Sequence, residues 1–111
     1  MSELSQTAAV FGAEAFNTMK AEAGAAYDSL TEKQKSSLER ATARWLELEM
    51  QDRAGQDVAA QKKFVKTTLD EFKMVGKVKV YDAFWKGVDK ALVSLGNFLG
   101  AAGKSFLGGV L

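Results

Sequence analysis

The sequence predicts an all-α protein of three to four helices that form a helical hairpin or bundle and assemble as an oligomer. Three observations lead to this prediction. The 111 residues contain no proline, so the strongest helix breaker is absent. Apolar residues recur at intervals of three and four along most of the chain. Capping and glycine residues lie between these stretches, at residues 28–31 and at Gly55, and Gly76 either ends a helix or marks a bend in a continuous one. The length allows one helical domain, residues 1–111, with a modest core.

Residues 1–30 are rich in alanine and predict an N-terminal helix over about residues 6–27. Phe11, Ala15 and Met19 lie near helical spacing, but the apolar stripe is thin and Gly12 weakens the helix. Small residues favour close packing against a neighbour. We expect this helix to depend on a partner helix for its stability.

Residues 28–31 predict a helix boundary, because two overlapping capping boxes occur there. Ser29 can pair with Glu32, and Thr31 can pair with Gln34. Both pairs satisfy free amide groups at a new N-terminus, and the sequence leaves both open.

Residues 31–76 predict a helical hairpin, with helices at about residues 32–53 and 58–75. Gly55 is the expected C-terminal cap of the first helix and Asp57 the N-cap of the second. A continuous helix through Gly55 is the alternative. Phe64 and Val65 compete for one core position of the second helix, and we place Phe64 there. The expected core residues of the hairpin are Leu38, Trp45, Leu48, Phe64, Leu69 and Phe72.

Residues 77–111 predict a long, apolar, glycine-rich helix. Lysine and valine alternate over residues 77–80, which is a weak strand signal, but the heptad pattern that starts at Val78 continues and favours a helix. Gly96, Gly100 and Gly103 are spaced for close helix packing. The heptad positions, expected to contact another subunit or a membrane, are Val78, Tyr81, Trp85, Val88, Leu92, Leu95, Leu99, Ala102 and Phe106.

The last 21 residues, 91–111, carry one charged side chain, Lys104. This stretch is as long as a membrane span. Asn97, Lys104 and the many glycines argue against a simple span. The alternative membrane role is an interfacial helix, with Lys86, Lys90 and Lys104 available to lipid phosphates.

Enzymatic chemistry is not expected. The chain has no histidine and no cysteine, which excludes Cys–His nucleophiles and ordinary zinc sites. P-loop, Rossmann and nucleophile-elbow motifs are absent from the sequence. Asp82 and Asp89 share one side of a helix, as solvated carboxylates commonly do. We therefore expect no catalytic site, cofactor, metal site or small-molecule substrate.

The net charge of +1 conceals an asymmetry. Residues 1–30 carry one lysine and four acids, whereas residues 61–90 carry eight lysines and four acids. Complementary charge between packed segments or subunits is the favoured explanation. A basic face for anionic lipid is the alternative. Nucleic acid is not favoured as a partner, because the basic stretch lacks arginine and is interrupted by acids.

These observations predict a non-enzymatic structural or assembly protein that forms homo-oligomers through its C-terminal helix, as a component of a viral particle or a secretion-type assembly. The alternative is a membrane-active or membrane-anchored protein whose residues 80–111 insert into a bilayer or lie on it. The N-terminus has no signal-peptide pattern, so we expect synthesis in the cytoplasm, followed by membrane association or incorporation into a particle.

Overall fold

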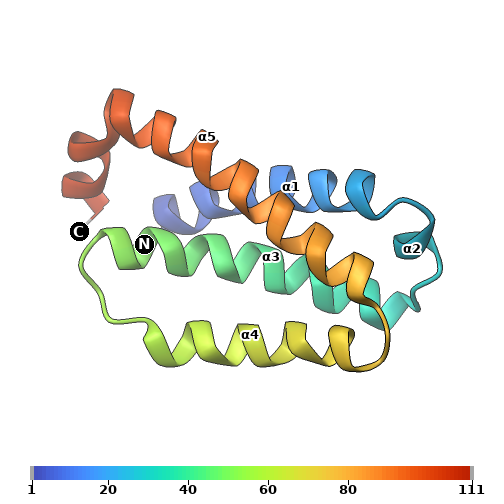
Figure 1. Cartoon of the computed structure of the whole chain (residues 1–111). Coiled ribbons are helices and arrows are strands. Elements are labelled where there is room, and N and C mark those ends of the chain that lie inside the picture. Colours follow the sequence, from blue (N-terminus) through green and yellow to red (C-terminus); the bar gives the residue numbers. More distant parts are fainter. Residues whose placement is uncertain (1, 111) are drawn as a thin grey trace.

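The computed structural model describes the backbone of residues 2–110 and the side chains of residues 6–97. All regular structure in this range is helical, as predicted. The helices are α1 (Ser2–Ala23), α2 (Ala25–Asp28), α3 (Glu32–Arg53), α4 (Ala59–Met74) and α5 (Val78–Val110) (Figure 1). The prediction of three to four helices omitted α2, which is a four-residue turn of helix between α1 and α3.

The four long helices run back and forth, so that each is antiparallel to the one before it (Figure 1). α1 packs against α5 and α3, and α4 packs against α3 and α5. The contacts of α1 are the most extensive. α4 lies at the edge of this arrangement, where it has neighbours on one side only (Figure 1).

The N-terminus of α3 is fixed by a capping box. The Thr31 hydroxyl accepts a hydrogen bond from the amide of Gln34 at 3.1 Å, and the Gln34 side chain accepts one from the amide of Thr31 at 2.9 Å. The structure thus selects Thr31 over Ser29. The Ser29 hydroxyl instead donates to the carbonyl of Ala26.

Glycines with positive φ end both helices of the predicted hairpin. Gly55 has φ 92° and follows α3, and Gly76 has φ 82° and follows α4. Each takes part in the paired backbone hydrogen bonds of a Schellman motif. α3 and α4 are therefore separate helices, as are α4 and α5. The N-cap of α4 is Val58 and not Asp57, although the Asp57 carboxylate accepts a hydrogen bond from the amide of Ala59.

The core of the predicted hairpin is confirmed except at one position. Leu38, Trp45, Leu48, Leu69 and Phe72 are buried, as expected. The prediction that Phe64 belongs to the core is wrong: its side chain is 74% exposed, and Val65 is buried in its place. The reason is the stripe on α4. Val65, Leu69 and Phe72 follow one another at intervals of four and three, and Phe64 lies about 100° away from Val65 around the helix.

Small residues let α1 approach its two neighbours closely. A Cβ atom on Gly12 would lie 3.0 Å from the Cα of Ala43 in α3. A Cβ atom on Gly87 in α5 would overlap the carbonyl oxygen of Ala15. This differs from the prediction, which placed the close crossing at Gly96. The nearest atom there would be Nη1 of Arg53 at 3.8 Å, an ordinary contact. The predicted Gly100 and Gly103 lie outside the residues whose surroundings are described.

Candidate functional site

The heptad face of α5 is, along much of its described length, part of the core of the chain itself. Val88 and Leu95 are buried, and Tyr81, Trp85 and Leu92 are half-buried. Val78 is 45% exposed. Val88 and Leu95 are therefore not on the surface. A second subunit or a membrane could reach them only if α5 were displaced. Leu99, Ala102 and Phe106 lie beyond the described side chains, so their predicted contact remains a prediction.

An aromatic cluster joins α5 to α3. The ring of Trp85 packs edge-on against Trp45 of α3, with centroids 5.0 Å apart, and against Phe84, with centroids 4.9 Å apart. Tyr81 packs against the same ring at 6.3 Å. Edge-to-face pairs of this kind contribute about 0.5–1.5 kcal/mol each beyond their burial. The cluster accounts for the partial burial of Trp85 within the chain.

Three lysines of α4 lie over this aromatic cluster. The ammonium groups of Lys62 and Lys66 are 5.2 and 5.8 Å from the ring centroid of Trp45, and that of Lys73 is 5.3 Å from Tyr81. Cation–π contacts at partly exposed sites contribute about 0.5–1 kcal/mol. Part of the basic character of α4 therefore serves packing within the chain.

Lys62 also links α4 to two acids of α3. Its Nζ lies 2.7 Å from Oε1 of Glu49 and 3.4 Å from Oδ2 of Asp52. Burial alone would lower the pKa of Lys62, but the hydrogen bonds and charges of Glu49 and Asp52 outweigh burial and raise it above its usual value of 10.5. Between α1 and α5, Lys86 lies 3.9 Å from Glu22. These pairs agree with the expectation of complementary charge between packed segments.

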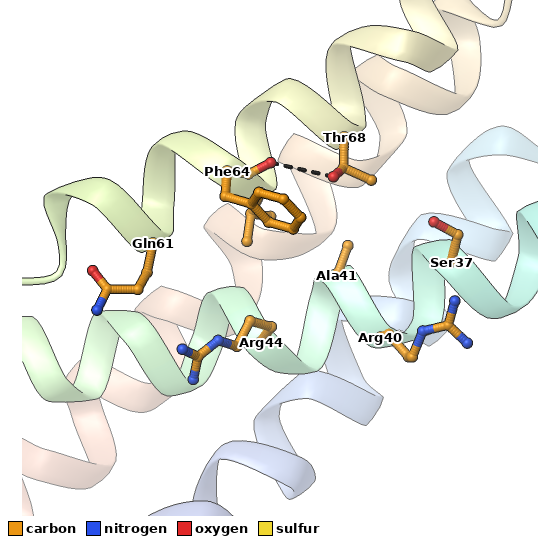
Figure 2. A pocket seen from close by; sticks show the side chains of 8 residues that line it. Ser37, Arg40, Ala41, Arg44, Gln61, Phe64 and Thr68 are labelled. Carbon is orange, nitrogen blue, oxygen red and sulfur yellow. Dashed lines mark hydrogen bonds between the residues drawn. The ribbon is translucent and has the colours of Figure 1, made fainter.

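A groove lies between α3 and α4, with a volume of about 540 Å³. Figure 2 shows Phe64 projecting from α4 into the space above α3, and Arg40 and Arg44 extending from α3. Arg44 forms an ion pair with Glu47. We call this the α3–α4 groove; its lining residues are Ser37, Arg40, Ala41, Arg44, Gln61, Phe64, Val65 and Thr68.

The α3–α4 groove was not predicted from the sequence. Phe64 was assigned to the core, and Arg40 and Arg44 were counted only as charges on the solvated face of a helix. Their spacing of four residues does place both arginines on one side of α3. However, a groove between two helices depends on how they pack against each other, and periodicity within one helix carries no signal for that.

The described side chains, residues 6–97, offer no group of three or more metal-ligating residues. Nor does any helix in the described part of the chain have the length and hydropathy needed to cross a bilayer. No family model matches the chain, and the comparisons found no similar characterised protein and no similar solved structure.

Proposed function

We propose that the chain is a non-enzymatic structural or assembly protein that forms homo-oligomers, and that the α3–α4 groove is a contact between copies. The observation that carries this proposal is Phe64. Its large apolar side chain is 74% exposed at the edge of a groove with an apolar floor, formed by Ala41 and Val65. Covering such a ring stabilises a complex by about 1.5–3 kcal/mol.

A second copy suits this surface because the patch carries both complementary parts. Phe64 supplies the projecting ring (Figure 2), and Ala41 and Val65 supply apolar lining against which the ring of a second copy would pack. A two-fold axis along the groove would lay α4 of each copy over α3 of the other. The exposed Arg40 of α3 would then come within reach of the exposed Glu71 of α4 in the second copy. The apolar surface of the groove and the pairing of opposite charges thus both favour self-association.

This proposal changes the surface that the sequence analysis favoured. Up to Leu95, the heptad residues of α5 contribute to the fold of the single chain. Beyond residue 97, α5 continues as a helix to Val110, in a sequence whose one charged side chain is Lys104. We propose this end as a second contact between copies, with Leu99 and Phe106 as its apolar residues. A bundle-forming component of a viral particle or secretion-type assembly is the proposed setting.

The experiment is sedimentation velocity on the full chain, from dilute to concentrated samples. We expect a mass that rises above the monomer value of 12.0 kDa with concentration. Phe64→Asp should shift the equilibrium to monomer. Val10→Asp is the matched control, because Val10 is 67% exposed but lies on α1, outside the groove. A wild-type chain that stays monomeric contradicts self-association. A Phe64→Asp chain that associates normally contradicts the groove.

The alternative, in which residues 80–111 insert into a bilayer, requires a larger rearrangement. Val80, Phe84 and Leu95 are buried within the chain, so insertion from residue 80 onward would detach α5 from α1 and α3. The membrane alternative therefore applies most directly to the end of α5 beyond residue 97, because inserting that end does not require α5 to detach from α1 and α3. In flotation with anionic vesicles, Leu99→Asp should then abolish binding.

A further inference from the structure

Three large apolar side chains are exposed together at the turn between α4 and α5. Met74 is 83% exposed, Val75 64% and Val78 45%. Among the described residues only three other large apolar side chains are as exposed, Val10, Phe64 and Val93, and each lies on a different helix. The turn lies at the end of the molecule that also holds α2, away from both chain termini (Figure 1).

The backbone holds these side chains outward. The amide of Gly76 donates to the carbonyl of Lys73 at 3.2 Å, and the amide of Lys77 donates to the carbonyl of Phe72 at 2.8 Å. Phe72 is itself buried in the core, which ties the turn to the body of the molecule. Met74 and Val75 therefore project from an ordered turn, so burying them against a partner costs little conformational entropy of the backbone.

The charged residues of the turn itself are all basic, although Glu71 lines a hollow with Val75, and Glu22 of α1 and Asp82 line another with Lys79. Lys73, Lys77 and Lys79 lie within residues 72–81, and this stretch contains no acid. Lys73 and Lys79 are exposed and Lys77 is half-buried. The flanking acids along the chain are Glu71 and Asp82, which precede and follow the basic stretch. Aliphatic side chains at the tip of the turn suit the acyl chains of an anionic bilayer, and the lysines around them suit its phosphate headgroups.

We propose that the turn formed by residues 73–79 docks on anionic membrane surfaces, with Met74 and Val75 inserted at the boundary of headgroups and acyl chains. Lys77 and Lys79 then contact lipid phosphates, whereas Lys73 lies over the ring of Tyr81. A nucleic acid is a poorer fit, because the turn has no arginine and no aromatic ring to stack on a base. This site goes beyond self-association and lies outside residues 80–111, so it depends neither on the α3–α4 groove nor on the C-terminal tail.

The test is flotation of the full chain with vesicles of phosphatidylcholine alone and with added phosphatidylserine. We expect binding to the anionic vesicles only. Val75→Asp should weaken this binding at least tenfold, because it places a charge at the insertion point. Val93→Asp is the matched control: the residue and the substitution are the same, and Val93 is 66% exposed on α5. It should bind as the wild type does, and both variants should melt at similar temperatures.

Two further variants keep the proposal testable if Val75→Asp fails to fold. Lys77→Glu and Lys79→Glu should each weaken binding about fivefold or more, from the loss of roughly one lysine–surface interaction. The proposal is overturned by a wild type that does not float, by equal binding to neutral vesicles, or by a Val75→Asp chain that floats as the wild type does. The last result would place binding in the tail.

Depth of insertion offers an independent readout. The chain has no cysteine, so Met74→Cys and Val93→Cys can each carry a single environment-sensitive fluorophore. On adding anionic vesicles, we expect a blue shift and a rise in intensity for the label at position 74, and no change at position 93. Equal responses at the two positions, or a response at position 93 only, would overturn the proposal.

Discussion

Gly87 of α5 lies directly against Ala15 of α1, so close that a Cβ atom on Gly87 would overlap the carbonyl oxygen of Ala15. A carbonyl oxygen belongs to the backbone and cannot rotate away. The two helices can therefore remain at this distance only while residue 87 is glycine. Since α1 supplies the most extensive contacts in the fold, this crossing positions much of the molecule.

Gly87→Ala should destabilise the protein by about 1–3 kcal/mol, because the helices must separate to admit the methyl group. The better helix propensity of alanine offsets part of this, by up to about 1 kcal/mol. Gly96→Ala is the matched control on the same helix, where the added atom makes an ordinary contact. It should be neutral or stabilising. Urea unfolding of both variants checks the prediction, and equal losses would contradict the close crossing.

Leu69→Ala and Phe64→Ala should separate the core of α4 from its exposed side. Leu69 is fully buried, so its truncation should cost about 2–5 kcal/mol. Phe64 is exposed, so its truncation should change the stability of the monomer by no more than about 0.5 kcal/mol. The measurement is thermal unfolding at low protein concentration, where association does not contribute. A large loss for Phe64→Ala would place Phe64 in the core after all.

Thr31→Ala should destabilise the protein by about 0.5–2 kcal/mol, since it removes one half of the capping box of α3. The control is Ser29→Ala, which removes a hydrogen bond between exposed groups and leaves the capping box intact. Its effect should be smaller. The measurement is the free energy of unfolding of the two variants in a chemical denaturant. A larger loss for Ser29→Ala would contradict the assignment of Thr31 as the cap of α3.

The free energy of unfolding should fall at alkaline pH, partly through Lys62. Its pKa in the folded protein is raised above 10.5 by the hydrogen bonds and charges of Glu49 and Asp52, which outweigh the effect of burial. A raised pKa means that Lys62 stabilises the fold fully below its unfolded-state pKa, and that this contribution is lost as pH rises through the folded-state pKa. Lys62→Gln should therefore be less stable at neutral pH and should show a shallower alkaline decline.

Tyr27 contributes to the same alkaline decline. Burial, followed by the charges of Glu39, Glu32 and Asp28, raises the pKa of its hydroxyl above the usual 10.0. The neutral hydroxyl is thus favoured in the folded protein, and this stabilisation is lost as pH rises through the raised pKa. Tyr27→Phe serves as the second variant in unfolding measurements across alkaline pH. If neither variant changes the decline, these two groups are not its cause.

Local signals predicted the helices well. α3 spans Glu32–Arg53, the same range that the sequence indicates, because Thr31 with Gln34 and the turn at Gly55 mark both ends. At Gly76 the sequence left open a helix end or a bend, and the structure shows that α4 ends there. These signals depend on neighbours a few residues away, so they are visible without the fold.

Tertiary partners could not be predicted in the same way. The heptad pattern indicates that Val88 and Leu95 are covered, but the covering helix belongs to the same chain and not to a second subunit. Phe64 is a different case, because the spacing of Val65, Leu69 and Phe72 within α4 already favours Val65 as the buried residue. Gly87 has no local sign of a close crossing, since the contact is made by Ala15, far away in the sequence.

Sedimentation of charge-swapped variants tests self-association through the α3–α4 groove most directly. Arg40→Glu and Glu71→Arg should each weaken association, because each places like charges opposite one another across the two-fold axis. Mixed in equal amounts, the two variants should form a heterodimer that is tighter than either variant with itself, because both of its crossings again pair opposite charges. If the mixture sediments as the average of the two separate samples, α4 of one copy does not lie over α3 of the other.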